Sequence, residues 1–222
     1  MKISIPKPLG LFVAWMFTFI AISSFFHIMG AYNFCYLEQW QTFVYDSSYV
    51  SNTFMQPGGL VQLTAGFLIQ FFHMPIAGIL ITAFLLSAIF LLMAHILKRW
   101  TGNNLLWPSA LLPVVALAFM HFNTNYLYEG TLAFLLMLVG LTFHLCIQST
   151  ISRFIYSLCY TVFLFATAGS IATLYVILLI IMEVFISPKK FVVYLFLILV
   201  VYLLAQYALW EGWFGEWKHT LL

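Results

Sequence analysis

Long runs of apolar residues follow one another through most of this chain. Residues 9–31, 75–97 and 191–210 are three such runs, and the shorter runs 105–120 and 131–147 lie between them. A helix rises 1.5 Å per residue, so about 20 apolar residues cover the hydrocarbon core of a bilayer. The pattern predicts a chain that crosses a membrane several times as α-helices.

Composition supports this prediction and excludes other classes. Apolar and aromatic residues make up 64% of the 222 positions, and charged residues only 6%. Soluble domains are nearer to half apolar and about a quarter charged. A net charge of +2 provides no basic face for nucleic acid. We expect an all-α, polytopic transmembrane bundle in contact with membrane lipid, organised as a single domain over residues 1–222.

The segment 154–186 is too long for one crossing and too short for two complete ones. As one helix its 33 residues would extend for about 50 Å. Small and polar residues gather at 167–170, so we predict two short helices that meet there inside the protein. Counting this hairpin as two crossings, the sequence predicts about seven spans.

Charge predicts the orientation. With the N-terminus in the cytoplasm, seven spans place nearly all basic residues on that side, as the positive-inside rule requires: Lys2, Lys7, Lys98, Arg99, Arg153, Lys189 and Lys190. The first run is longer than the apolar core of a signal peptide, so we interpret it as an uncleaved span. We expect a bacterial inner-membrane location, with the tryptophan-rich tail 211–222 as an interfacial helix on the outer surface.

The first outer loop, residues 32–74, is the first candidate site. It is rich in aromatic and amide residues, carries Glu38 and Asp46, and has no Lys or Arg. After Pro57-Gly58-Gly59, small and polar residues recur every three or four positions: Gly59, Gln62, Gly66, Gln70 and His73. This spacing predicts a juxtamembrane or re-entrant amphipathic helix whose polar face lines a cavity, with Gln62 and Gln70 contacting a substrate. An ordinary interfacial helix with its polar stripe in water is the alternative.

Three histidines approach the same predicted outer boundary: His27, His73 and His121. Together with nearby carboxylates they could hold a divalent metal ion or move a proton. Taken singly, each is typical of an interfacial residue with its polar tip in water.

Glu183 is the carboxylate well inside a predicted span, and Lys190 follows two turns later. A structural ion pair between them is one interpretation, and a proton relay is the other.

The three cysteines, Cys35, Cys146 and Cys159, lack the spacing of a metal or redox motif. We interpret the latter two as small buried hydrophobic residues, and they indicate no redox compartment.

The layout of a cytoplasmic N-terminus, one span, a long acidic outer loop with a juxtamembrane helix and further spans resembles the N-terminal seven-helix module of C-type glycosyltransferases. These enzymes take sugars from polyprenyl-phosphate carriers. The resemblance implies catalytic carboxylates at Glu38, or else Asp46, and at Glu129, with Asn123 and Asn125 nearby for substrate binding. Such a carboxylate would act as general base or hold a metal ion. Glu38 is not part of an acidic pair here, and asparagines stand where that family has aspartates.

A closer likeness is to uncharacterised bacterial multi-span proteins that share a block of short motifs: Glu38-Gln39, Pro57–Leu60, Gln70–Phe72, Pro75 and Gly78. Three functions therefore stay open. The first is a glycosyltransferase-like protein that binds a polyprenyl-linked substrate in an outward-facing cavity. The second is a non-catalytic subunit that packs against other membrane subunits. The third is a transporter or channel built around the break at 167–170.

Overall fold

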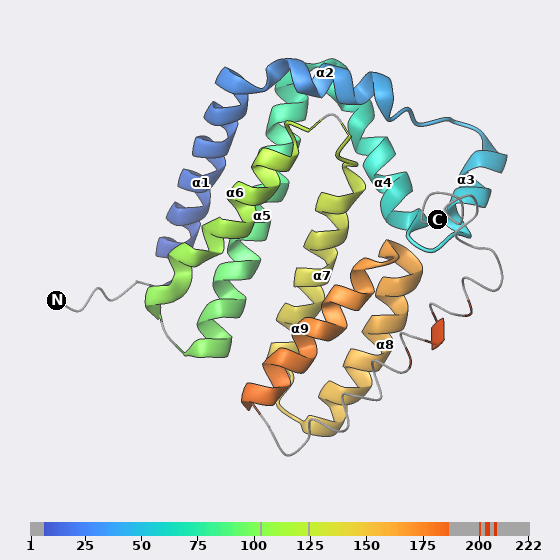
Figure 1. The fold of residues 1–222 in the computed structure, drawn as a ribbon. Helices are drawn as coiled ribbons and strands as arrows, with labels where there is room; N and C mark the ends of the chain where they lie inside the picture. The colour runs from blue at the N-terminus through green and yellow to red at the C-terminus, as the bar shows by residue number, and fades with distance from the viewer. Residues whose placement is uncertain are drawn as a thin grey trace. The chain divides into compact units, whose positions relative to one another are not determined.

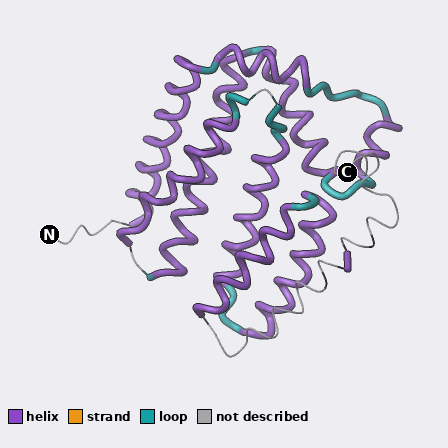
Figure 2. Tube along the Cα trace, viewed as in Figure 1, coloured by secondary structure: helices purple, strands orange, loops and turns teal. Residues whose placement is uncertain are grey.

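The computed structural model describes residues 7–102, 104–123 and 125–186, together with Val200, Leu203, Leu204 and Tyr207. Every regular element in these residues is a helix, as Figures 1 and 2 show. The predicted all-α class is therefore confirmed for the described part of the chain.

Four helices are long and apolar enough to cross a membrane. They are α1 (Lys7–Met29), α5 (Pro75–Thr101), α7 (Glu129–Cys146) and α8 (Thr150–Ala168). Their length and composition are compatible with an integral membrane protein.

Of the other predicted spans, two form shorter helices and the last lies almost wholly outside the described residues. Residues 105–120 form a 3₁₀ segment, η2 (Asn104–Ala110), followed by α6 (Leu111–Met120), and the hairpin's second arm is α9 (Ile171–Ile186). Pro108 lies inside η2, where a proline removes a backbone donor and disfavours a regular α-helix. The predicted span 191–210, apart from four isolated positions, and the tail 211–222 lie outside the described residues.

The chain forms two compact units that the sequence pattern did not reveal. Unit 1 comprises residues 1–43 and 64–142, and unit 2 comprises residues 44–63 and 143–222. The chain passes between them after residue 43, within α4 (Gly59–Ile69) and within α7.

Unit 1 is organised around α5. Helices α1, α2 (Ala31–Trp40) and α6 and the 3₁₀ segments η1 (Gln70–His73) and η2 all pack against it. Half of the apolar window of α5 is buried, compared with 11% for α1, so α5 is central and α1 peripheral. Near its start, Gly78 lies under the Phe34 ring, where a Cβ would approach ring carbons to 3.0 Å. At its other end, Lys98 and Arg99 precede Gly102, whose φ of 66° closes the helix.

Unit 2 contains an antiparallel hairpin of α8 and α9 (Figure 1). The helices are separated at Gly169, within the predicted 167–170 break, and its φ of 68° and ψ of −131° suit only glycine. The Pro57-Gly58-Gly59 turn lies against this break, where the Gly58 N–H donates to the carbonyl of Ala166 at 3.1 Å. A Cβ at either Gly58 or Gly169 would touch the other's backbone. Two glycine motifs that are far apart in the sequence therefore pack directly against each other.

The predicted outer loop is mostly helical. It contains α2, α3 (Ser47–Phe54), α4 and η1. Along α4 and η1 the buried residues are apolar: Val61, Ala65, Ile69 and Phe72. Gln62 and His73 are exposed. Gly66 and Gln70 of the same stripe are half-buried. The apolar residues at steps of three and four occupy the most protected face, and a cavity along the polar face stays a prediction.

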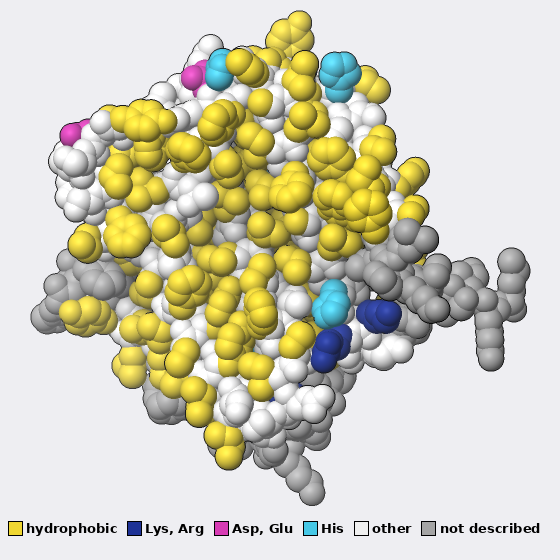
Figure 3. All heavy atoms as spheres, turned by 180° about the vertical axis from the view of Figure 1, so that it is seen from behind, with side chains coloured by type: hydrophobic (Ala, Val, Ile, Leu, Met, Phe, Trp, Pro, Cys, Tyr) yellow, Lys and Arg dark blue, Asp and Glu magenta, His cyan; other side chains and the backbone are white. Residues whose placement is uncertain are grey.

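Hydrophobic side chains cover most of the face drawn in Figure 3. Well-exposed examples on the candidate spans are Phe17, Ile28 and Ile76. All three cysteines are free. Cys146 and Cys159 are exposed, although we expected both to be buried. An apolar surface of this extent is typical of a chain whose solvent is lipid.

Candidate functional site: an apolar cavity and a buried polar cluster in unit 1

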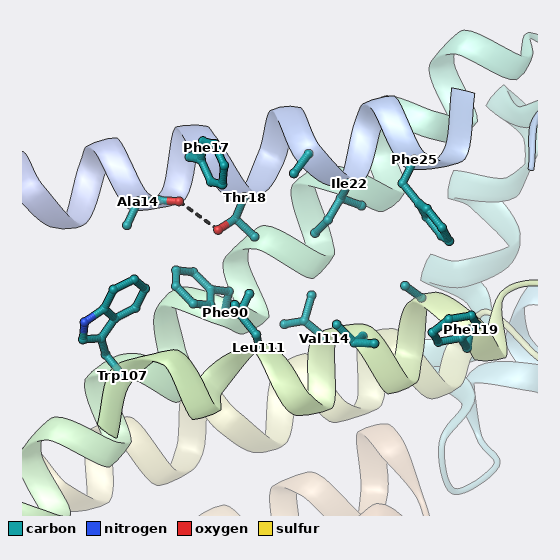
Figure 4. Close-up of a pocket in the computed structure, with 13 residues that line it drawn as sticks. Ala14, Phe17, Thr18, Ile22, Phe25, Phe90, Trp107, Leu111, Val114 and Phe119 are labelled. Carbon is teal, nitrogen blue, oxygen red and sulfur yellow. Dashed lines mark hydrogen bonds between the residues drawn. The ribbon is translucent and has the colours of Figure 1, made fainter. Parts of the chain in front are cut away.

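A cavity of about 490 Å³ lies in unit 1 among α1, α5, η2 and α6, and we call it the α1–α6 cavity. Figure 4 shows side chains from α1 and α6 pointing toward one another across it. Its lining residues are Ala14, Phe17, Thr18, Ala21, Ile22, Phe25, Phe90, Trp107, Leu111, Val114, Val115, Ala118 and Phe119.

The lining offers a ligand almost no hydrogen bonds. Thr18 carries the one side-chain hydroxyl, and that hydroxyl donates to the carbonyl of Ala14 at 2.8 Å (Figure 4). From Ala14 to Phe25 the cavity follows α1 for about 16 Å. Phe17 and Phe119 are 75% and 64% exposed, so the cavity is open to its surroundings. A space of this shape and chemistry suits a hydrocarbon chain that enters sideways from the bilayer.

An aromatic cluster closes one end of the cavity. Phe25 contacts Phe119 and Phe122 with ring centroids 6.3 and 5.5 Å apart. Phe26 in turn lies edge-on to the ring of His121, at 6.2 Å. This cluster therefore connects the apolar cavity to a polar region around the turn after α6.

That polar region is held together by Gln41, the residue that ends α2. Its side-chain amide donates to the carbonyl of Tyr126 at 3.1 Å, and its Oε1 accepts from the N–H of Tyr128 at 3.2 Å. We call this pair of bonds the Gln41 clamp. It fastens the 121–128 loop to the C-terminal end of α2, although more than 80 residues separate them in the chain.

Beneath the clamp lies a buried hydrogen-bonded chain. His121 Nε2 lies 3.0 Å from the hydroxyl of Thr131, which lies 3.0 Å from the hydroxyl of Tyr126. The ring of His121 is 2% exposed, and burial lowers its pKa to about 4. Tyr128, fully buried, shares a hydrogen bond of 3.2 Å with Thr82, and burial raises the pKa of its hydroxyl. These groups are therefore neutral near pH 7.

The predicted carboxylates fall in both units. Glu38 lies in the last turn of α2, three residues before Gln41, and Glu129 begins α7 directly after Tyr128. The clamp therefore brings together the two segments that carry them.

Asp46 lies in unit 2, where it caps α3 by accepting from the N–H of Tyr49 and from the Ser48 hydroxyl. These hydrogen bonds, that of Ser48 first, lower its pKa. Asp46 thus has a structural task.

The three predicted metal ligands do not assemble. His73 is exposed and bonds the carbonyl of Gln70, in its own turn, at 2.8 Å. His27 is exposed beside a small hollow with Ser23, Ser24 and Ile79, while His121 is buried. Among the described residues, no three His, Cys, Asp or Glu side chains are close enough to share a metal ion. The three-histidine site is therefore a wrong prediction, because similar depth along different helices does not make side chains converge.

The predicted substrate-binding amides are dispersed as well. Gln62 is exposed in unit 2, and Gln70 is half-buried in unit 1. Asn123 and Asn125 are exposed, and the Oδ1 of Asn123 accepts from the backbone of Asn125 at 3.0 Å. The amide that does join two segments is Gln41, one of several amide residues in the polar outer loop. Nothing in its spacing distinguishes it from Gln39.

Comparison with known sequences places the chain in a family. The sequence model of a family of unknown function, DUF6057, matches residues 6–222. The chain belongs to this family. No curated protein and no solved structure matches it.

This DUF6057 chain holds a second buried polar cluster, in unit 2. Glu183 is paired there with Arg153 and His144, at 2.9 and 3.1 Å. The partner considered from the sequence, Lys190, lies outside the described residues. Sequence spacing pointed to Lys190 because it is near along the chain, whereas folding brings α7, α8 and α9 together.

Proposed function

We propose that this protein is a glycosyltransferase-like membrane protein that binds a polyprenyl-linked substrate. The hydrocarbon chain of the substrate lies in the α1–α6 cavity, and its polar head lies toward the Gln41 clamp. The observation that carries the proposal is the cavity itself, which is apolar, elongated and open at exposed aromatic residues.

The cavity would select its ligand by shape. A lipid chain that leaves the bilayer for an apolar cavity gains little hydrophobic free energy, because lipid tails are equally apolar. It gains van der Waals contacts instead, and these depend on close fit. Aromatic rings at Phe17, Phe90 and Trp107 give the lining rigid surfaces against which a branched polyprenyl chain can pack.

The polar head requires groups at the end of the cavity. Glu38 and Glu129 lie on the two segments that the clamp joins, and both are partly exposed. One of them would act as general base on an acceptor hydroxyl, or both would hold a divalent cation against the phosphate. Glu38 is our first candidate for the base. The site would face the outer side of a bacterial inner membrane, as the charge distribution predicts.

Ligand binding can be tested with a matched pair of substitutions on exposed valines. Val115 is 49% exposed and lines the cavity, whereas Val13 is 58% exposed and does not. We expect Val115→Phe to reduce retention of a polyprenyl phosphate at least several-fold in native mass spectrometry, because the added ring occupies the cavity. Val13→Phe should behave as the unmodified protein. Equal retention by both variants would remove the cavity from the proposal.

Catalysis is tested by single amide substitutions. Loss of a general base reduces rate by about 10²–10⁴-fold, so Glu38→Gln or Glu129→Gln should lower transfer from a polyprenyl-phosphate-linked sugar by that amount. Asp46→Asn is the control, because asparagine also caps helices. If neither glutamate variant lowers transfer, these two carboxylates are not the general base. If lipid is retained and the unmodified protein shows no transfer, the protein binds the lipid without performing this reaction.

A further inference from the structure

Four buried polar side chains meet in unit 2 at the ends of three helices. His144 lies in the last turn of α7, Arg153 in the first turn of α8 with Ser157 one turn later, and Glu183 in the last turn of α9. His144 and Ser157 are 0% exposed, Glu183 is 1% exposed and Arg153 is 9% exposed. We call these residues the His144 cluster. It shares no residue with the α1–α6 cavity or the Gln41 clamp.

Both ring nitrogens of His144 have polar partners. Nε2 lies 3.1 Å from Glu183 Oε1, and Nδ1 lies 2.8 Å from the Ser157 hydroxyl oxygen. That hydroxyl also lies 2.8 Å from the backbone carbonyl of Arg153. Arg153 Nε is 2.9 Å from the same carboxylate oxygen, but its N–H is not directed at it, so this contact is an ion pair.

Counting hydrogens shows that this arrangement fits two protonation states. The Ser157 hydroxyl has one hydrogen and two acceptors within reach, His144 Nδ1 and the Arg153 carbonyl. If the hydrogen points to Nδ1, the neutral imidazole donates from Nε2 to the Glu183 carboxylate. If it points to the carbonyl, Nδ1 must carry a hydrogen to bond Ser157. A second hydrogen is then needed between Nε2 and Oε1, where two acceptors would otherwise face each other.

We propose that the His144 cluster is a binding site for one proton. In the uptake step, the Ser157 hydroxyl rotates from Nδ1 to the Arg153 carbonyl, and a proton from solution forms an N–H bond at the vacated Nδ1. His144 becomes an imidazolium between the Ser157 oxygen and the Glu183 carboxylate. No heavy atom moves, which matters in a packed interior where displacement of side chains is costly.

The surrounding charges make this uptake selective for a single proton. Glu183 supplies one negative charge and Arg153 one positive charge, so the cluster is neutral before uptake and carries one positive charge after it. Apart from Glu129, which begins α7 at the end opposite His144, the other titratable side chains described on these three helices are tyrosines and cysteines: Cys146 on α7, Tyr156, Cys159 and Tyr160 on α8, and Tyr175 on α9. Ionisable groups kept at membrane depth commonly mark proton sites.

The proton site is tested by nuclear magnetic resonance of ring-¹⁵N histidine in the full chain in lipid nanodiscs. His144→Gln identifies the signal of His144. As the pH is lowered, we expect the ring to change from one protonated nitrogen to two. A ring that keeps one protonated nitrogen down to the lowest pH at which the protein stays folded would overturn the proposal.

Two variants test the roles of the neighbours. Glu183→Gln should abolish the doubly protonated form, because only the cation of Arg153 would then lie beside it. Ser157→Ala should reduce its population several-fold at the acidic end, since the imidazolium loses a hydrogen-bond acceptor. Ser87→Ala is the matched control. Ser87 is equally buried, bonds a carbonyl of its own helix and lies in unit 1. If Ser157→Ala leaves the His144 signal as unchanged as Ser87→Ala does, the hydroxyl has no part in proton uptake.

Discussion

At the residue scale, one half-buried amide in unit 1 joins two segments of backbone. Gln41 bonds the backbone at Tyr126 and Tyr128 with the two ends of one amide. Only a side chain with both a donor and an acceptor can do this. The residue thus holds in place the loop that carries the buried His121.

Replacement of Gln41 tests this role. Gln41→Ala should lower the free energy of unfolding by about 2 kcal/mol, since two hydrogen bonds of about 1 kcal/mol each are lost. Gln41→Glu keeps the acceptor and loses the donor. We therefore expect the hydrogen bond to the Tyr126 carbonyl to be lost, while the Tyr128 amide stays partly protected from hydrogen exchange. Hydrogen exchange of that amide and thermal unfolding measure both effects. Gln39→Ala, on the exposed face of the same helix, should change neither.

His121 predicts a pH dependence of stability. Its pKa is lowered from 6.5 to about 4 in the folded protein, so between these values the unfolded chain binds more protons than the folded one. The free energy of unfolding should have its full value above pH 6.5. It should fall as the pH drops toward 4, by about 3 kcal/mol in total.

The unfolding midpoint, followed from pH 7 to pH 4, measures this dependence. His121→Asn keeps a polar partner for Thr131 but does not titrate, so its stability should be nearly constant over that range. An equally steep loss in this variant would assign the effect to another group.

At the element scale, glycines decide where helices end and how closely they approach. Gly59, at the start of α4, has the carbonyl of Thr53 so near that an added Cβ would overlap the oxygen. Gly102, which ends α5, has open space around it but a φ of 66°. The two positions require glycine for different reasons, contact in one case and backbone conformation in the other.

Alanine at each position separates these reasons. Gly59→Ala should lower the free energy of unfolding by about 3 kcal/mol or more, because backbone must move to admit the methyl group. Gly102→Ala should cost only about 1 kcal/mol, the strain of a left-handed non-glycine residue. Thermal unfolding in detergent compares them. Equal losses of unfolding free energy in the two variants would show that the backbone between α3 and α4 shifts easily to admit the methyl group. The close contact would then not explain the glycine.

At the scale of the whole molecule, the apolar surface and the positions of the charges predict how the protein lies in a membrane. Within unit 1, Lys98 and Arg99 end α5, while the start of α5 packs against α2, which carries Glu38. The 27 residues of α5 extend for about 40 Å, enough to cross the hydrocarbon core. Acidic and basic groups therefore lie at opposite ends of the central helix.

Cysteine labelling in intact cells tests this topology. In a chain whose three native cysteines are replaced by serine, Tyr32→Cys should react with a membrane-impermeant maleimide from outside. Thr101→Cys should react only after permeabilisation. Both residues are exposed and belong to unit 1, so differences in labelling report the membrane side. Labelling of both from the same side would contradict the predicted orientation.

Sequence reasoning succeeded where a property depends on neighbours along the chain. Apolar runs predicted α1, α5, α7 and α8, because helix length and hydrophobicity are local. The break near Gly169 was predicted from small and polar residues, since a glycine in that conformation is also a local requirement. Predictions about convergence fared worse. His27, His73 and His121 lie near the ends of predicted spans, but spacing along the chain does not determine where their side chains point, and among the described residues they form no metal site.

The sequence by itself determined the helical class and the apolar surface, since each follows from composition and periodicity. Only the tertiary structure decided which polar groups meet. Gln41 reaches a loop more than 80 residues away, and Glu183 pairs with His144 and Arg153 from two other helices. The reason is physical: a buried polar group must find its partner in space. Helix packing, which no single segment encodes, determines where that partner lies.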